Sequence, residues 1–236
     1  MLLRERRLAS NKQRIGIVVP LYIYPGPQWK KLADTKRGHP SVPMIAVINP
    51  YNGPGNTRDS NYVAGVEVLR SAGIRILGYV STNYGSRTKE SVIADMETYS
   101  KWYHVDGMMF DEMSNKEGYE GYYLCLAEYA RRIGSTTTIG NPGTGVPSSY
   151  FGSMNVLCIY ENQGLPEISI LKSRCNAGRE KSEFAMISYR VDRCEPIYLS
   201  KLADYVNWVY ITDADLPNPY NRLPSYLNSE VLGVGT

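Results

Sequence analysis

The chain has 236 residues, of which 43% are hydrophobic and 21% charged, so it carries enough apolar sequence for a sizeable core. Lys and Arg number 26 against 23 Asp and Glu, and a formal net charge of +3 is too weak to indicate a nucleic-acid partner. No run reaches the roughly 18 apolar residues that a membrane span requires. The first apolar run, 15–19, is too short for a signal peptide, so we expect a cytoplasmic protein as written, or an extracellular one whose leader was removed.

The hydrophobic pattern predicts eight short strands that are buried on both faces, as in a parallel sheet. In chain order they cover residues 15–22, 43–48, 74–80, 105–110, 136–140, 155–160, 184–189 and 208–212. Helical spacing appears between several of them, at 28–36, 63–70, 89–103 and 118–133. The strands recur about every 27 residues, which is close to the length of a (β/α)8 unit. We therefore predict an α/β fold, a single-domain (β/α)8 TIM barrel over 15–236, with a flexible basic segment at 1–14 and a Pro/Tyr-rich tail from 217.

Tyrosine and cysteine usage adds two expectations. The chain has 20 Tyr against 3 Phe, an excess that favours aromatic faces at a wet, hydrogen-bonding surface. The four cysteines form no Cys-x-x-Cys pair, which gives no support to a zinc or thioredoxin-like site. Cys125 and Cys158 are predicted to be buried thiols, whereas Cys175 and Cys194 could pair.

The residues at or just past the strand ends would share one rim of the barrel. They are mostly amides, phenols and carboxylates: Tyr22, Tyr24, Asn49, Tyr51, Asn52, Tyr79, Asn83, Tyr84, Asp111, Glu112, Asn141, Tyr160, Glu161, Asn162, Tyr189, Arg190 and Asp213. Such side chains hydrogen-bond to hydroxyl groups and stack on pyranose rings, so we expect a polysaccharide or oligosaccharide partner. A phosphate is disfavoured, because the loop 52–55 contains a proline and no lysine follows it.

Carboxylates are the best candidates for catalysis because the chain has only two histidines. His39 lies in a polar loop and His104 precedes the fourth strand, at the opposite end of a barrel from its chemistry. We therefore expect no metal and no other cofactor. Asp111 and Glu112 follow the fourth strand and Glu161 follows the sixth, and glycoside hydrolysis uses two carboxyl groups on either side of the scissile bond.

Structural roles for the same acids remain open. Asp111 and Glu112 could cap the following helix, since acids are favoured near a helix N-terminus. Glu161 could form a salt bridge with Arg190. Asp213 fits a loop or helix-capping residue better than a catalytic one.

Six motifs occur in order along the chain: Val19-Pro20-Leu21-Tyr22, Asn49-Pro50-Tyr51-Asn52-Gly53-Pro54-Gly55, Gly78-Tyr79-Val80-Ser81-Thr82-Asn83-Tyr84-Gly85, residues 106–112, Asn141-Pro142-Gly143 and Tyr160-Glu161. Together they resemble the spherulin-4 family, through roughly the first 160 residues and more loosely beyond. The resemblance implies a (β/α)8 glycoside hydrolase that cleaves galactosaminogalactan, an α-1,4-linked polymer of galactose and N-acetylgalactosamine. It also implies that Asp111 is the nucleophile, Glu161 the acid/base and Glu112 a supporting acid.

Three functional hypotheses follow. The first is an endo-acting glycoside hydrolase on an amino-sugar polysaccharide, either with Asp111 as nucleophile or with a substrate N-acetyl group attacking while Asp111 orients it. The second is a non-catalytic carbohydrate-binding or spore/cell-coat protein that uses the same rim. The third is a different barrel enzyme, such as a lyase or an isomerase, because fold does not fix function.

Overall fold

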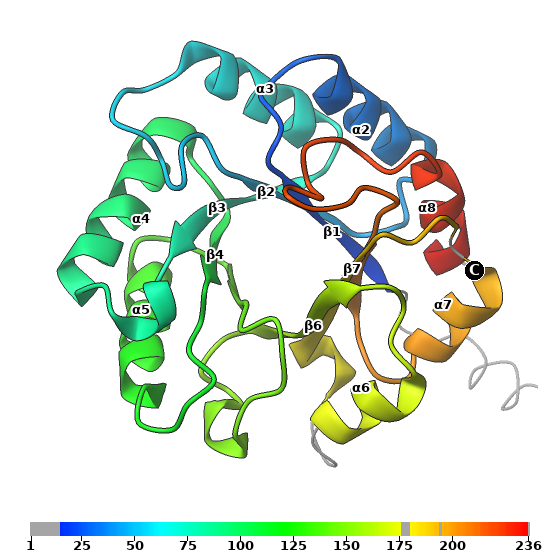
Figure 1. Cartoon of the computed structure of the whole chain (residues 1–236). Helices are drawn as coiled ribbons and strands as arrows, with labels where there is room; N and C mark the ends of the chain where they lie inside the picture. The colour runs from blue at the N-terminus through cyan, green and yellow to red at the C-terminus, as the bar shows by residue number, and fades with distance from the viewer. Residues whose placement is uncertain (1–14, 176–179, 194, 236) are drawn as a thin grey trace, which may run out of the picture.

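The computed structural model describes residues 15–175, 180–193 and 195–235, which form a closed barrel of parallel strands (Figure 1). The strands are β1 (Gly16–Leu21), β2 (Met44–Ile48), β3 (Arg75–Ser81), β4 (Gly107–Asp111), β5 (Thr137–Gly140), β6 (Val156–Gln163), β7 (Phe184–Tyr189) and β8 (Trp208–Ile211). Each strand pairs with its neighbours in sequence, and β1 closes the barrel against β8. The predicted (β/α)8 barrel is therefore confirmed. The predicted segment 1–14 and Cys194 lie outside the described residues.

Helices surround the strands as an outer ring (Figure 1). They are α2 (Pro27–Gly38), α3 (Ser60–Ser71), α4 (Lys89–Tyr103), α5 (Glu120–Arg132), α6 (Ile168–Arg174), α7 (Pro196–Leu202) and α8 (Leu227–Gly235), with short 3-10 turns η1 (Asn83–Gly85), η2 (Ser148–Tyr150) and η3 (Lys181–Glu183). The connection from β5 to β6 contains only the turn η2, and α8 lies within the tail, where we predicted no helix. None of the helices in the described ranges has the length and apolar character needed to cross a membrane.

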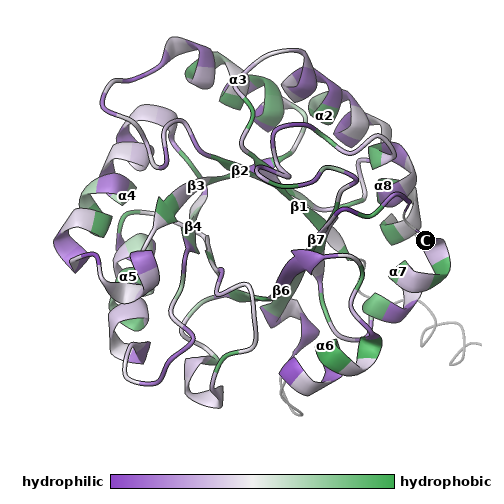
Figure 2. Ribbon diagram, viewed as in Figure 1, coloured by the Kyte–Doolittle hydropathy of each residue, from purple (hydrophilic) through white to green (hydrophobic). Residues whose placement is uncertain are grey.

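The barrel strands are apolar because they are covered on both faces. Every residue of β1 and β2 is buried, and Figure 2 shows β1 in hydrophobic green, whereas the end of β6 at the barrel mouth is hydrophilic purple. The expectation that the tyrosines line a wet surface holds only in part. Tyr99 and Tyr123, for example, are fully buried, and their hydroxyls bond to the Ile48 carbonyl (3.2 Å) and the Ser114 N–H (2.6 Å). Buried tyrosine is used here because its hydroxyl satisfies backbone groups at strand and loop ends.

The segment after β8 returns across the mouth of the barrel. Tyr220 packs edge-on against Tyr22 of the first loop, with ring centroids 5.5 Å apart, and lies 6.3 Å from the Tyr210 ring of β8. The Leu223 N–H bonds to Gln28 Oε1 of α2 at 2.7 Å. The tail is thus tied to both the first and the last units of the barrel.

Gly107 is required where β4 meets β5. A Cβ atom at this position would lie 2.0 Å from the backbone oxygen of Thr137, which cannot move without breaking the strand pairing. We expect Gly107→Ala to destabilise the protein by at least about 2 kcal/mol. Gly121→Ala on α5 is the matched control, because its Cβ would meet nothing within 4 Å, and it should cost no stability. Urea unfolding measures both, and equal midpoints would contradict the prediction.

Candidate active site

Two carboxylates from strands β4 and β6 meet at one end of the barrel. Asp111 ends β4, Glu161 lies in the last part of β6, and Asn141 directly follows β5 between them. The side-chain N–H groups of Asn141 donate to Asp111 Oδ1 at 2.8 Å and to Glu161 Oε2 at 2.5 Å. The two acceptor oxygens are therefore no farther apart than the sum of these distances, 5.3 Å. Arg190, the alternative partner of Glu161, lies 3.4 Å from Asp215 instead.

A turn after β5 fixes the orientation of the Asn141 amide. Its Oδ1 accepts the Gly143 N–H at 3.0 Å, so its nitrogen must face the two acids. Gly143 has a φ of 65°, in the left-handed region that favours glycine. Its carbonyl accepts the Glu161 N–H at 3.0 Å. The Asn-Pro-Gly loop thus positions both the bridging amide and one of the acids that it bridges.

The environment of Asp111 favours its protonated form. Burial first, and then the negative charge of Glu161, raise the pKa of Asp111 to about 7. Hydrogen bonds from the Glu112 N–H, Asn141 and the Tyr79 hydroxyl oppose this shift. Near neutral pH the Asp111 carboxyl group is therefore protonated for part of the time, whereas a carboxyl group of ordinary pKa would be fully ionised. One ionised and one protonated carboxyl group is the state that acid-assisted nucleophilic attack needs.

Tyr220 from the tail completes the surroundings of Glu161. Its hydroxyl donates to Glu161 Oε1. Burial and the Glu161 charge both raise the pKa of Tyr220 far above its ordinary value, so the phenol remains a donor. Sequence reasoning missed this residue: it expected the tyrosine-rich tail to cover one end of the barrel but gave no register for it.

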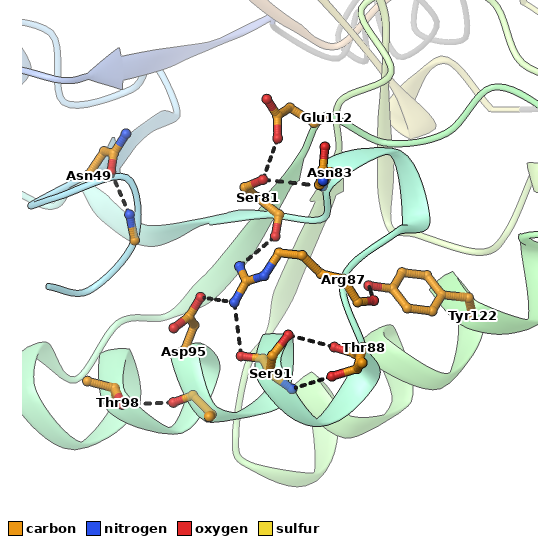
Figure 3. Close-up of polar contacts among 12 residues, drawn as sticks. Asn49, Ser81, Asn83, Arg87, Thr88, Ser91, Asp95, Thr98, Glu112 and Tyr122 are labelled. Carbon is orange, nitrogen blue, oxygen red and sulfur yellow. Dashed lines mark hydrogen bonds and ion pairs between the residues drawn. The ribbon is translucent and has the colours of Figure 1, made fainter. Parts of the chain in front are cut away.

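Glu112 is held in a strained backbone conformation beside the pair. Its φ is 51°, and its carbonyl accepts the Thr82 hydroxyl at 2.8 Å and the Tyr84 N–H at 2.7 Å. The Ser81 hydroxyl donates to Glu112 Oε2 and accepts the Asn83 N–H at 3.2 Å (Figure 3). Since α5 begins at residue 120, neither Asp111 nor Glu112 caps it.

An ion pair outside the barrel supports this loop. Arg87 donates to the Ser81 carbonyl at 2.8 Å and pairs with Asp95 of α4 at 2.8 Å (Figure 3). The Tyr122 hydroxyl of α5 in turn donates to the Arg87 carbonyl at 2.9 Å. The end of β3, which presents Ser81 to Glu112, is therefore fixed by contacts from both α4 and α5.

The acids line a cavity of about 460 Å³. Its walls are Tyr84, Asp111, Glu112, Asn141, Pro142, Gly143, Glu161, Tyr189, Leu216, Pro219 and Tyr220. Tyr84 and Leu216 are 60% and 63% exposed, so they form its outer edge. This size is within the range of small-molecule sites and can hold a sugar ring. Among the described residues, no group of three His, Cys, Asp or Glu side chains is arranged to hold a metal ion.

Only some of the residues predicted to share one rim line the cavity that holds the acids. Six of them line the cavity, namely Tyr84, Asp111, Glu112, Asn141, Glu161 and Tyr189. Tyr22 and Tyr79 lie directly behind it, with ring centroids 5.4 Å apart, and the charge of Asp111 acts on both hydroxyls. The remaining members have their side chains elsewhere.

Several predicted rim residues serve local structure. Tyr160 is buried and its hydroxyl donates to the carbonyls of Gln163 and Gly164, both at 3.3 Å. Asn162 and Asn83 are exposed and do not line the cavity. Asp213 accepts from Arg222 at 2.8 Å and from the Ser225 N–H at 3.1 Å, and so ties down the tail.

The loops after β1 and β2 carry the rest of the predicted rim. Tyr24 and Tyr51 line a separate pocket, described below. Asn49 accepts the Gly53 N–H at 2.9 Å, and Asn52 is exposed with a φ of 49° in the same turn. None of these four residues lines the cavity that holds the acids.

Comparison with known proteins places this architecture in a family. Residues 16–234 match the family described as spherulation-specific family 4. Spherulin-4 of Physarum polycephalum is 31% identical over an alignment 242 positions long, which covers 96% of this chain and 72% of that protein. The crystal structure of Aspergillus clavatus Sph3 in complex with GalNAc superposes with a TM-score of 0.85 at 23% identity, covering 95% of this chain and 98% of that one, and so shares its fold. The chain belongs to spherulation-specific family 4.

Proposed function

We propose that the protein is a glycoside hydrolase that cleaves within a polysaccharide of N-acetylgalactosamine and galactose, using Asp111 and Glu161. The observation that carries this proposal is the pair of carboxylates that Asn141 bridges at the wall of the cavity. Their facing oxygens are at most 5.3 Å apart, the sum of the two hydrogen bonds to Asn141. Retaining glycosidases place their carboxyl groups about 5–5.5 Å apart and inverting ones about 6.5–9.5 Å, so the spacing favours retention.

The sugar class follows from the walls of the cavity and from the relatives. The polar walls are phenols, an amide and carboxylates, which suit hydroxyl and acetamido groups, and Pro142, Leu216 and Pro219 add apolar surface. The Aspergillus clavatus protein of the same fold was crystallised with GalNAc. A longer chain would continue past Tyr84 and Leu216 at the exposed edge of the cavity, which supports cleavage within the chain.

The proposed mechanism uses the pair in two steps. The ionised Asp111 attacks the anomeric carbon while Glu161 gives its proton to the leaving oxygen, forming a glycosyl–enzyme intermediate. Glu161 then takes a proton from the water that releases the sugar. Glu112, held by Ser81, adds negative charge near the oxocarbenium-like transition state. The raised pKa of Asp111 favours the reverse order, in which Asp111 is the acid and Glu161 the nucleophile.

Separate replacement of the two acids tests the proposal. Asp111→Asn and Glu161→Gln should each lower the turnover of galactosaminogalactan at least about a hundredfold, because each loses a group that forms or breaks a bond. Release of reducing ends measures the turnover. Glu128→Gln and Asp192→Asn are the controls, since both acids are exposed and lie outside the cavity. Glycan binding without any product in the unchanged protein would instead indicate a carbohydrate-binding protein.

Azide separates the two role assignments. In a variant that lacks the nucleophile, azide attacks from the nucleophile's side and yields a glycosyl azide of inverted configuration. In a variant that lacks the acid/base, azide attacks the glycosyl–enzyme and the product keeps its configuration. If Asp111 is the nucleophile, as proposed, Asp111→Ala gives inversion and Glu161→Ala gives retention. The opposite pattern would exchange the roles and agree with the raised pKa of Asp111.

Asp111 should make the stability of the protein depend on pH. Its folded-state pKa of about 7 lies above the ordinary 3.8, so the native state binds an extra proton between these values and loses stability as pH rises through this interval. Asp111→Asn removes this dependence. We expect the variant to be more stable than the unchanged protein, with the gap wider at pH 8 than at pH 5 by about 2–3 kcal/mol. Urea unfolding at both values measures it, and a gap independent of pH would contradict the prediction.

Tyr220 should contribute to catalysis from the tail. Tyr220→Phe keeps the ring on Tyr22 but removes the donor to Glu161, and should lower kcat about tenfold to a hundredfold. Tyr226→Phe is the matched control in the same segment, since its hydroxyl bonds to the Val191 carbonyl at 2.6 Å outside the cavity. Initial rates and melting temperatures are compared for both. An equal loss of rate in the two variants would indicate a general effect on the tail.

A further inference from the structure

A second pocket is formed by the loops that follow β1 and β2. We call it the distal pocket; its volume is about 280 Å³, and its principal walls are Tyr24, Pro50, Tyr51, Thr57, Asp59 and Tyr62. It shares no wall residue with the catalytic cavity. Because all eight strands are parallel, these two loops leave the barrel on the face that carries Asp111. We infer that the distal pocket binds further sugar units of the polysaccharide that the catalytic cavity cleaves.

Tyr24 forms a fixed aromatic wall of the distal pocket. Its hydroxyl donates to Asp59 Oδ2 at 3.0 Å and accepts from Asn61 Nδ2 at 2.7 Å. Its ring stands edge-on to the Tyr62 ring, with centroids 5.6 Å apart. The side chain is nevertheless 58% exposed. An exposed ring that is already held by two hydrogen bonds loses little entropy on binding, which is a property of built ligand sites.

Tyr51 presents a second aromatic face on a constrained loop. It is 79% exposed, the most exposed large apolar side chain among the described residues. Its N–H bonds to the Gly53 carbonyl at 3.1 Å, and the Gly53 N–H bonds to Asn49 Oδ1 at 2.9 Å. The flanking Pro50 and Pro54 restrict the loop further. The loop thus holds in water a large ring whose exposure contributes nothing to the core.

The chemistry of the walls identifies the ligand. The pocket walls are aromatic rings, prolines, neutral polar side chains and one carboxylate, Asp59, and none of them is a Lys, Arg or His. This excludes a site built for a phosphate or another anion. Both oxygens of Asp59 accept hydrogen bonds from Tyr24 and the start of α3. Neutral hexose and N-acetylhexosamine units, which offer an apolar ring face and hydroxyl groups, fit this surface.

A polysaccharide that occupies both pockets at once binds the protein more tightly than one that occupies a single pocket. Once a chain occupies the catalytic cavity, binding of another of its units in the distal pocket is intramolecular. Long chains then gain affinity, whereas chains too short to reach both sites gain none. This inference rests on the proposed function, since it assumes that the same polysaccharide occupies the cavity.

The test compares substrates of increasing length. For the unchanged protein, kcat/KM should rise once oligosaccharides of N-acetylgalactosamine become long enough to span both sites. Tyr51→Ala should remove this rise and lower kcat/KM on the long chains about tenfold, while short oligosaccharides are cleaved as before. Tyr51→Phe is the matched control: it keeps the ring face and should keep the rise. If kcat/KM of Tyr51→Ala depends on chain length as in the unchanged protein, or falls equally on short and long chains, the inference that the distal pocket binds sugar is wrong.

A binding measurement keeps this inference separate from the proposed function. Retention on immobilised galactosaminogalactan is compared for the unchanged protein, Tyr51→Ala and Tyr51→Phe. If no protein cleaves the polymer but Tyr51→Ala binds it about tenfold more weakly than Tyr51→Phe, the distal pocket stands and the hydrolase proposal fails. If cleavage occurs and all three bind alike, the hydrolase proposal stands and the distal pocket fails.

Discussion

The site depends on one constraint: Asp111 and Glu161 lie so close together that the side-chain amide of Asn141 donates a hydrogen bond to each of them. Two ionised carboxylates at this distance repel each other, and their burial disfavours charge further. The Asn141 amide offsets part of this cost, because its two N–H groups donate to both acids. Tyr79 and Tyr220 donate from the sides. In the described part of the chain, the hydrogen bonds that these carboxylates accept come from uncharged donors, which the barrel strands, their loops and the tail hold in place.

Three of the six non-glycine residues with positive φ in the described part of the chain lie beside this pair. Asn83, Tyr84 and Glu112 all have φ values near 50° although none is glycine. Such conformations persist only where the surroundings fix them. Here the Glu112 carbonyl accepts two hydrogen bonds from the loop after β3, and Arg87 secures the end of that strand from outside the barrel. The loop after β3, anchored from outside the barrel by Arg87, therefore supports the strained geometry.

The sequence predicted what depends on strand order and missed what depends on loop paths. The apolar runs located the strands, and parallel order alone placed Asp111 and Glu161 one strand apart around Asn141. Tyr220 could not be found in this way, because it reaches Glu161 through an irregular segment whose course depends on tertiary contacts. Tyr24 and Tyr51 were expected beside the acids, but residues that follow strand ends can turn away along their own loops, and these two line a different pocket.

The tail links closure of the barrel to the site. The pairing of β1 with β8 ends at Ile17 and Val209, so the Ile211 N–H has no partner on β1 and donates to Glu230 Oε1 of α8 at 2.8 Å. Glu230 is fully buried where β1 and β8 meet, and this burial raises its pKa to about 8. Tyr220 lies between β8 and α8 in the same segment. Because the Tyr220 ring also lies 6.3 Å from the Tyr210 ring of β8, the strand that closes the barrel helps to position the phenol that donates to Glu161.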